Sequence, residues 1–229
     1  MEMLLTTPKN ERIGSRRIKR KEPGPGPLNN RADRKLTFVA DMFTVAMGDN
    51  FLELKKTILH REIICRGYRY LTNLSLDYDK YVKRIWARVW ELFFKTTFDV
   101  SGYSEAENEK CHFVAVNKGK WSISDAEWID KSSSCSTDKT KEYLSRLNNK
   151  MIIERMVMLD MVDAEIIFSP QNRTWTVKYK SVIGSTNWIM IPPITQLIKH
   201  KPYEVIRTIE FFELVLDALV NANKAEKIT

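Results

Sequence analysis

Apolar positions in the first third of the chain fall into two blocks separated by a polar break. Residues 36–47 (LTFVADMFTVAM) are rich in Phe, Val and Thr, which is typical of a largely buried strand. Residues 48–50 (GDN) interrupt the run, and Asn50 with Glu53 three residues later has the spacing of a capping box. The apolar residues that follow recur at helical spacing. We therefore expect a strand over residues 36–47 and a helix from residue 51 to about 65.

A second amphipathic segment covers residues 77–95. Its apolar residues recur at intervals of three and four, which indicates a helix with one buried face. These residues are Tyr78, Tyr81, Val82, Ile85, Val89, Leu92 and Phe93.

Two hairpins are expected further along the chain. Residues 111–116 and 120–124 flank an Asn-Lys-Gly turn. Residues 164–168 and 173–180 flank Ser169–Asn172, and Trp175, Val177 and Tyr179 alternate there with polar residues. This two-residue period predicts an antiparallel strand with one face in solvent.

Helices are expected at residues 141–161 and from Pro202 onward, where a proline in the first turn costs no hydrogen bond. Helices and strands are interspersed without a regular βαβ alternation. The sequence therefore predicts the α+β class, with antiparallel hairpins packed against amphipathic helices in a single compact domain over residues 36–229.

Residues 1–35 differ from the rest in composition. They hold ten Lys or Arg against four Asp or Glu, which gives a net charge of +6 out of +8 for the whole chain. They are poor in large apolar residues and include the segment Pro23–Pro27, PGPGP. Such a segment cannot bury enough apolar surface to offset its ordering entropy, so we predict a disordered basic arm.

The sequence contains few features that indicate catalysis. There is no glycine-rich phosphate loop, nucleophile elbow or HExxH motif, so we expect no enzyme and no cofactor. Cys111 and His112 would point to opposite faces of a strand, which argues against a shared zinc ion. Asp160, Asp163 and Glu165 form the one acidic cluster worth testing as a two-metal site, and we interpret it as a solvated helix end.

Three cysteines, an odd number without framework spacing, favour reduced thiols over a secreted disulfide scaffold. No run of about 18 apolar residues is present, so we expect neither a membrane span nor secretion.

Binding features are stronger than catalytic ones. The first is a compact basic run of the kind that binds nuclear-import receptors, RNA phosphates or anionic lipid. It consists of Arg16, Arg17, Lys19, Arg20 and Lys21. The second is a basic ridge expected on the helix at 77–95, flanked by Trp86 and Trp90, with a solvated helix face as the alternative. It consists of Lys80, Lys83, Arg84 and Arg88. The Ser- and Thr-rich loop at residues 131–141 also offers hydroxyl groups for phosphorylation.

The basic cluster at Arg16–Lys21, the apolar segment at 36–47 that runs into residue 51, and the overall length resemble the matrix proteins of rhabdoviruses, in particular the plant-infecting branch that replicates in the nucleus. The resemblance implies a non-enzymatic virion protein that self-associates, condenses ribonucleoprotein and bridges it to anionic membrane. The arm lacks the Pro-Pro-x-Tyr and Pro-Thr-Ala-Pro motifs that many such proteins carry.

Two further functions remain open. One is a nuclear RNA-binding or regulatory accessory protein, such as a suppressor of host defence, that uses the arm for import. The other is a nuclease built on Asp160, Asp163 and Glu165. The expected partners are therefore RNA or ribonucleoprotein, an anionic membrane surface, further copies of the chain, and a nuclear import receptor. The expected location is the virion and the host nucleus or cytoplasm, as a peripheral membrane protein.

Overall fold

A computed structural model describes residues 26–84, 87–100, 110–119, 123–132, 138–190 and 193–222. The chain enters this region through α1 (Pro27–Met47), which begins with proline at its first position and ends at Gly48. Residues 27–35, which the sequence assigned to the arm, are therefore part of a helix. Residues 1–25 lie outside the described residues.

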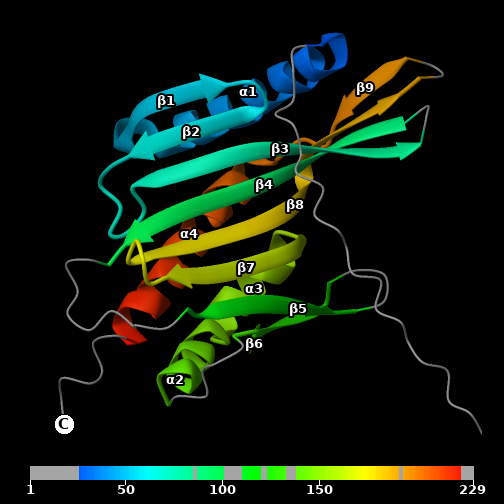
Figure 1. The fold of residues 1–229 in the computed structure, drawn as a ribbon. Helices are drawn as coiled ribbons and strands as arrows, with labels where there is room; N and C mark the ends of the chain where they lie inside the picture. Colours follow the sequence, from blue (N-terminus) through cyan, green and yellow to red (C-terminus); the bar gives the residue numbers. More distant parts are fainter. Residues whose placement is uncertain are drawn as a thin grey trace, which may run out of the picture.

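The described strands form one antiparallel sheet (Figure 1). Their order in the sheet is β1-β2-β3-β4-β8-β7-β5-β6, and β9 pairs with the far end of β8. The strands are β1 (Phe51–Thr57), β2 (His60–Cys65), β3 (Asn73–Arg84), β4 (Ala87–Asp99), β5 (His112–Lys118), β6 (Asp125–Asp130), β7 (Met161–Ser169), β8 (Thr174–Ile189) and β9 (Ile194–Leu197).

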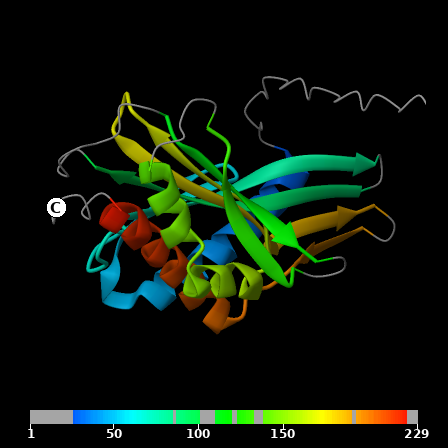
Figure 2. The same cartoon turned by 90° about the horizontal axis from the view of Figure 1, so that it is seen from below.

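Helices pack against this sheet and supply the other half of the core. In Figure 1, α1 lies behind the end of the sheet that holds β1 and β2, and α4 (Pro202–Ala222) lies behind the central strands. α2 (Asp138–Leu147) and α3 (Lys150–Met158) lie beside α4 (Figure 2). Tyr179 of β8 contacts Phe211 and Phe212 of α4, with ring centroids 5.6 Å apart in each pair. Each such aromatic pair contributes about 1 kcal/mol beyond the area it buries. No helix within the described ranges is long and apolar enough to cross a membrane.

The predicted α+β class, with antiparallel hairpins packed on amphipathic helices, is confirmed. The hairpin of β7 and β8 and the helix starting at Pro202 also lie where the sequence placed them. Other boundaries shift. The second strand of the β5–β6 hairpin is residues 125–130 rather than 120–124, and residues 141–161 divide into α2, α3 and the start of β7.

Three predicted elements are wrong. Residues 36–47 belong to a helix, because Leu36, Val39, Phe43 and Met47 recur at helical spacing and are buried on one face. Residues 51–65 form the β1–β2 hairpin, and residues 77–95 form most of the β3–β4 hairpin. A spacing of four residues fits one face of a strand as well as one face of a helix, so part of each pattern was ambiguous.

A buried arginine and a partly buried aspartate attach α1 to the β1–β2 hairpin. The Arg61 side chain is 3% exposed, and its Nη2 lies 2.8 Å from Oδ2 of Asp33 in α1. The other oxygen of Asp33 accepts the backbone N–H of Leu59 at 2.8 Å. Leu59 occupies the turn between β1 and β2 with a φ of +59°, a conformation that L-residues adopt at a cost. Asp33 therefore fixes both the turn and the buried guanidinium.

Candidate functional site

A groove of about 520 Å³ lies between α1 and β9. α1 contributes Arg31, Arg34, Lys35 and Phe38 to its lining. Pro193, Thr195, Leu197 and Lys199, in β9 and beside it, line the other side. We call this site the basic groove, since half of its lining residues are cations.

Helical geometry explains why these cations gather there. Ala32, Leu36, Val39 and Phe43 recur every three or four residues and are fully buried, so they form the face of α1 that packs on the sheet. Arg31, Arg34, Lys35 and Phe38 lie on the opposite part of the helix surface. Phe38 keeps 46% of its surface exposed, although it is a large apolar side chain.

No carboxylate among the described residues lines the basic groove. Asp33 is near in sequence to its arginines, but both of its oxygens are engaged by Arg61 and by the N–H of Leu59. Arg31, Arg34, Lys35 and Lys199 therefore present their charges to the groove without an acidic neighbour in its walls. Such a surface attracts anions, and it does so less strongly as salt is added.

Exposed apolar side chains lie at the same end of the sheet as the basic groove, but on the other face of the β8–β9 hairpin from Thr195 and Leu197. Ile189, at the end of β8, pairs with Ile194 at the start of β9, and they are 46% and 50% exposed. Met190 and Ile198 are exposed next to them in sequence. We call Ile189, Met190, Ile194 and Ile198 the apolar rim. Cations and exposed aliphatic groups at the same end of a protein are a combination that suits the boundary between water and lipid.

Arg88 lies at the start of β4, next to the apolar rim. Its backbone pairs with Trp188 of β8, and its guanidinium carbon lies 5.8 Å from the centroid of the Trp188 ring. This distance allows a cation–π contact, which adds a further cation at this end of the sheet.

The predicted basic ridge is wrong as a helical feature. Lys80, Lys83 and Arg84 have their backbones in β3, and Arg88 lies in β4. Trp90, expected to flank the ridge, is fully buried in the core. The side chains of Lys80, Lys83 and Arg84 lie outside the described residues, as does Trp86. The basic run Arg16, Arg17, Lys19, Arg20 and Lys21 and the hydroxyl-rich residues 133–137 also lie outside them.

The acidic candidates do not converge on a metal site. Asp160 follows α3 with a φ of +48°. Asp163 lies 3.8 Å from the ammonium of Lys180, and Glu165 lies 3.5 Å from that of Lys178. In the part of the chain that the structure describes, no cluster of three or more metal-ligating side chains occurs. The acids of β7 instead form cross-strand ion pairs on the sheet face away from the helices.

Both described cysteines, Cys65 and Cys111, are buried thiols. Burial and the nearby Glu213 carboxylate raise the pKa of the Cys65 thiol to about 11, which keeps it protonated and unreactive at neutral pH. Cys111 is 1% exposed, whereas the ring of the adjacent His112 is partly exposed, 3.7 Å from Glu165. The two side chains thus point to opposite faces, as their positions on a strand predicted.

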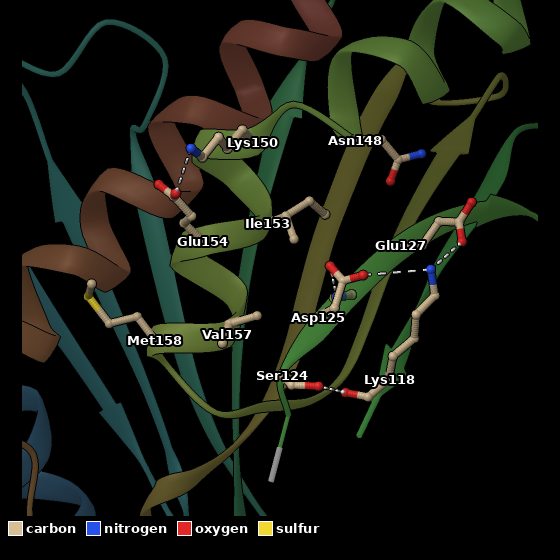
Figure 3. A pocket seen from close by; sticks show the side chains of 11 residues that line it. Lys118, Ser124, Asp125, Glu127, Asn148, Lys150, Ile153, Glu154, Val157 and Met158 are labelled. Carbon is tan, nitrogen blue, oxygen red and sulfur yellow. Dashed lines mark hydrogen bonds and ion pairs between the residues drawn. The ribbon is translucent and has the colours of Figure 1, made fainter. Parts of the chain in front are cut away.

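A larger groove of about 890 Å³ lies between α3 and the β5–β6 hairpin (Figure 3). Ile153, Val157 and Met158 of α3 form its apolar wall. Its two lysines are both paired with acids of its lining, since Lys118 pairs with both Asp125 and Glu127 and Lys150 pairs with Glu154. This groove therefore has no strong preference for one sign of charge, in contrast to the basic groove.

Sequence reasoning missed the basic groove because it placed residues 36–47 in a strand and residues 31–35 in the arm. The signal was nevertheless present, since Pro27 marks a helix start and the apolar residues from Ala32 to Met47 follow the helical period. No local pattern joins Lys199 to these residues, because about 160 positions separate them in the chain.

Comparison with known proteins gives one match. A family model described as "Protein of unknown function (DUF3156)" matches residues 76–219, which is more than half of the chain. No curated protein and no solved structure matches.

Proposed function

The chain belongs to this family of unknown function, DUF3156, and we propose that it is a non-enzymatic protein that docks on anionic membrane surfaces. The docking end is formed by the basic groove and the apolar rim. The observation that carries the proposal is that Arg31, Arg34, Lys35 and Lys199 line one groove with no carboxylate among its described lining residues, at the end of the sheet where aliphatic side chains are exposed.

Both halves of this surface favour lipid. Cations close to an anionic leaflet contribute about 1 kcal/mol each, and the attraction fades within a Debye length of about 8 Å at physiological salt. The apolar rim adds a component that salt does not screen, because burying aliphatic groups among acyl chains is hydrophobic. RNA would use the cations but gains nothing from Ile189, Met190, Ile194 and Ile198.

The other functions predicted from the sequence also depend on positive charge. A matrix-type role in condensing ribonucleoprotein, and nuclear import through Arg16–Lys21, would both employ the basic arm that precedes α1. Direct binding of the full chain to lipid and to RNA separates these roles from one another.

Vesicle flotation tests the proposal. The full chain should float with vesicles that contain phosphatidylserine and stay behind with pure phosphatidylcholine vesicles. Neutralising the groove with Arg31→Gln, Arg34→Gln, Lys35→Gln and Lys199→Gln should lower the affinity by about 1 kcal/mol per cation. Replacing Ile189, Met190 and Ile194 with Ser should weaken the binding that persists at high salt.

A matched control removes the same charge elsewhere. Lys118→Gln, Lys131→Gln, Lys141→Gln and Lys150→Gln alter four exposed lysines on or beside β5, α2 and α3. If this variant loses as much vesicle binding as the groove variant, net charge rather than the groove is responsible and the proposal is wrong. Binding to single-stranded RNA that depends on the groove cations, without vesicle binding, would favour the RNA-binding alternative.

A further inference from the structure

β1 and β6 lie at the two ends of the strand order, and each therefore has a backbone edge that no neighbouring strand covers. Side chains close the β6 edge. The amide of Asn148 accepts the N–H of Trp128 at 2.7 Å and donates to its C=O at 3.0 Å. The N–H of Ala126 is taken by Oδ1 of Asp125 at 2.9 Å. Such devices block the addition of another strand.

The β1 edge is different. The N–H of Arg66 donates to Asn50 at 2.8 Å, and that of Tyr78 donates to Leu59 at 2.9 Å, which fixes the alternation of hydrogen bonds along β2. Through the β1–β2 register, the backbone groups of Glu53, Lys55 and Thr57 bond to β2. The N–H and C=O groups of Leu54 and Lys56 consequently point outward.

Nothing in the described part of the chain closes this edge. No side chain there bonds to the outward backbone groups of Leu54 or Lys56. The side chains along β1 are largely exposed, including Leu52 at 49%. An open edge of this kind is a template for strand addition.

The sequence of β1 matches an antiparallel copy of itself. If two β1 strands pair about Leu54, then Glu53 of each copy lies opposite Lys55 of the other, and Leu52 lies opposite Lys56. Leu54 faces its counterpart as a hydrogen-bonded pair, which its outward backbone groups allow. A register centred on Lys55 would instead place two lysines opposite each other, so charge selects the first register.

The charged side chains of Glu53 and Lys55 are free to contact a second copy. Glu53 forms no ion pair with any residue that the structure describes, and it is exposed. Lys55 lies 3.6 Å from Glu62 of β2. In the paired register, Lys55 of one copy would sit between Glu62 of its own chain and Glu53 of the other. Twofold symmetry repeats the contact, as in most homodimers.

We propose that the chain forms a symmetric dimer through β1, in which two copies join their sheets edge to edge about Leu54. The occupant of this edge is a second copy of the chain, identified by the Glu53–Lys55 complementarity. The dimer does not require membrane binding, so the proposals of membrane docking and of dimerisation can be tested independently.

Light scattering after size exclusion, over a range of concentrations, tests the dimer in the full chain. Wild type should shift from dimer to monomer on dilution. Lys56→Pro removes an outward N–H that β2 does not use, so it should give a folded monomer at all concentrations. A wild-type chain that is monomeric throughout, or a Lys56→Pro variant that is folded and still dimeric, would overturn the proposal.

A charge exchange tests the register itself. Glu53→Lys places lysines opposite each other, and Lys55→Glu with Glu62→Lys places glutamates opposite each other while keeping the ion pair between β1 and β2. Each variant alone should dimerise about tenfold more weakly or worse. Mixed together, they should form a heterodimer, because every facing pair then has opposite charges.

The control is Glu154→Lys, which makes the same charge change on the exposed surface of α3 and should dimerise like wild type. A mixture of the two β1 variants that stays monomeric, or variants whose separate dimers are as tight as wild type, would rule out pairing about Leu54.

Discussion

The two outermost strands of the sheet meet the same physical problem in opposite ways. β6 has the outward N–H and C=O of Trp128 satisfied by the single amide of Asn148. β1 leaves Leu54 and Lys56 open, in a sequence whose charges suit a second copy. An edge strand must be either closed or used, because unpaired backbone groups attract other strands. The difference supports the proposal that β1 contacts a second copy, whereas β6 is an end of the sheet.

The two edges are also attached to the helices by different chemistry. The β1–β2 hairpin is held to α1 through the charged pair of Asp33 and Arg61, whereas β6 is held to the start of α3 through the neutral amide of Asn148. Removing the carboxylate that pairs with a buried arginine costs more than removing a neutral hydrogen bond, because the buried charge is left without its acidic partner. Substitutions at these positions rank the two attachments.

The largest effect is expected for Asp33→Ala. The substitution leaves the buried Arg61 guanidinium without a carboxylate and removes the acceptor for the N–H of Leu59. We expect the free energy of unfolding in urea to fall by about 3–5 kcal/mol. Asp41→Ala, at an exposed position of the same helix, is the control and should change it by less than about 0.5 kcal/mol. Equal losses for the two variants would show that Asp33 is not a specific clamp.

Acid should lower the free energy of unfolding through His200, which packs against the centre of the sheet, away from both edges. His200 is buried between the rings of Phe43 and Phe94, with centroids 5.9 Å away in each case, and burial lowers its pKa from 6.5 to about 4. The unfolded chain therefore binds a proton between pH 6.5 and 4 that the folded chain does not. The contribution to stability is complete above pH 6.5 and is lost as the pH falls toward 4, by about 3 kcal/mol.

Urea unfolding at a series of pH values measures this effect. His200→Leu removes the titrating group, so the slope of stability against pH between 4 and 6.5 should become smaller than in wild type. If the slope is unchanged in the variant, groups other than His200 account for the acid sensitivity.

A smaller effect is expected for Asn148→Ala, which opens the β6 edge. The N–H and C=O of Trp128 lose their partners, and the free energy of unfolding should fall by about 1–3 kcal/mol. The opened edge should also make the protein more prone to associate at high concentration. Asn148→Gln, which keeps an amide on a longer side chain, should recover part of the stability. If Asn148→Ala is as stable as wild type and associates no more than wild type does, Asn148 does not close the β6 edge.

Some elements were predictable from the sequence because only one local reading fits them. In β8, Trp175, Val177 and Tyr179 alternate with polar residues after a turn, and all three are at most 1% exposed. The helix that begins at Pro202 is long and carries apolar residues from Val205 to Leu219 on its buried side. Ile206 is an exception within this helix, since it is apolar but 49% exposed.

Residues 51–65 and 77–95 were not predictable in this way. Apolar residues four positions apart lie on one face of a helix and also on one face of a strand, so the pattern alone does not choose. The choice depends on which element each face packs against. Buried Leu76, Tyr78, Trp90, Leu92 and Phe94 show the two-residue period only once β3 and β4 are paired and covered.

The sequence by itself determined the class of the fold, the β7–β8 hairpin, the C-terminal helix and the concentration of basic charge near the N-terminus. Each of these depends on composition or on periods within a short window. The tertiary structure decided the features that carry function, because they join distant residues. The basic groove brings Arg31 beside Lys199. The contrast between the β1 and β6 edges exists only when the order of strands is known, since an edge is a property of the sheet and not of the strand.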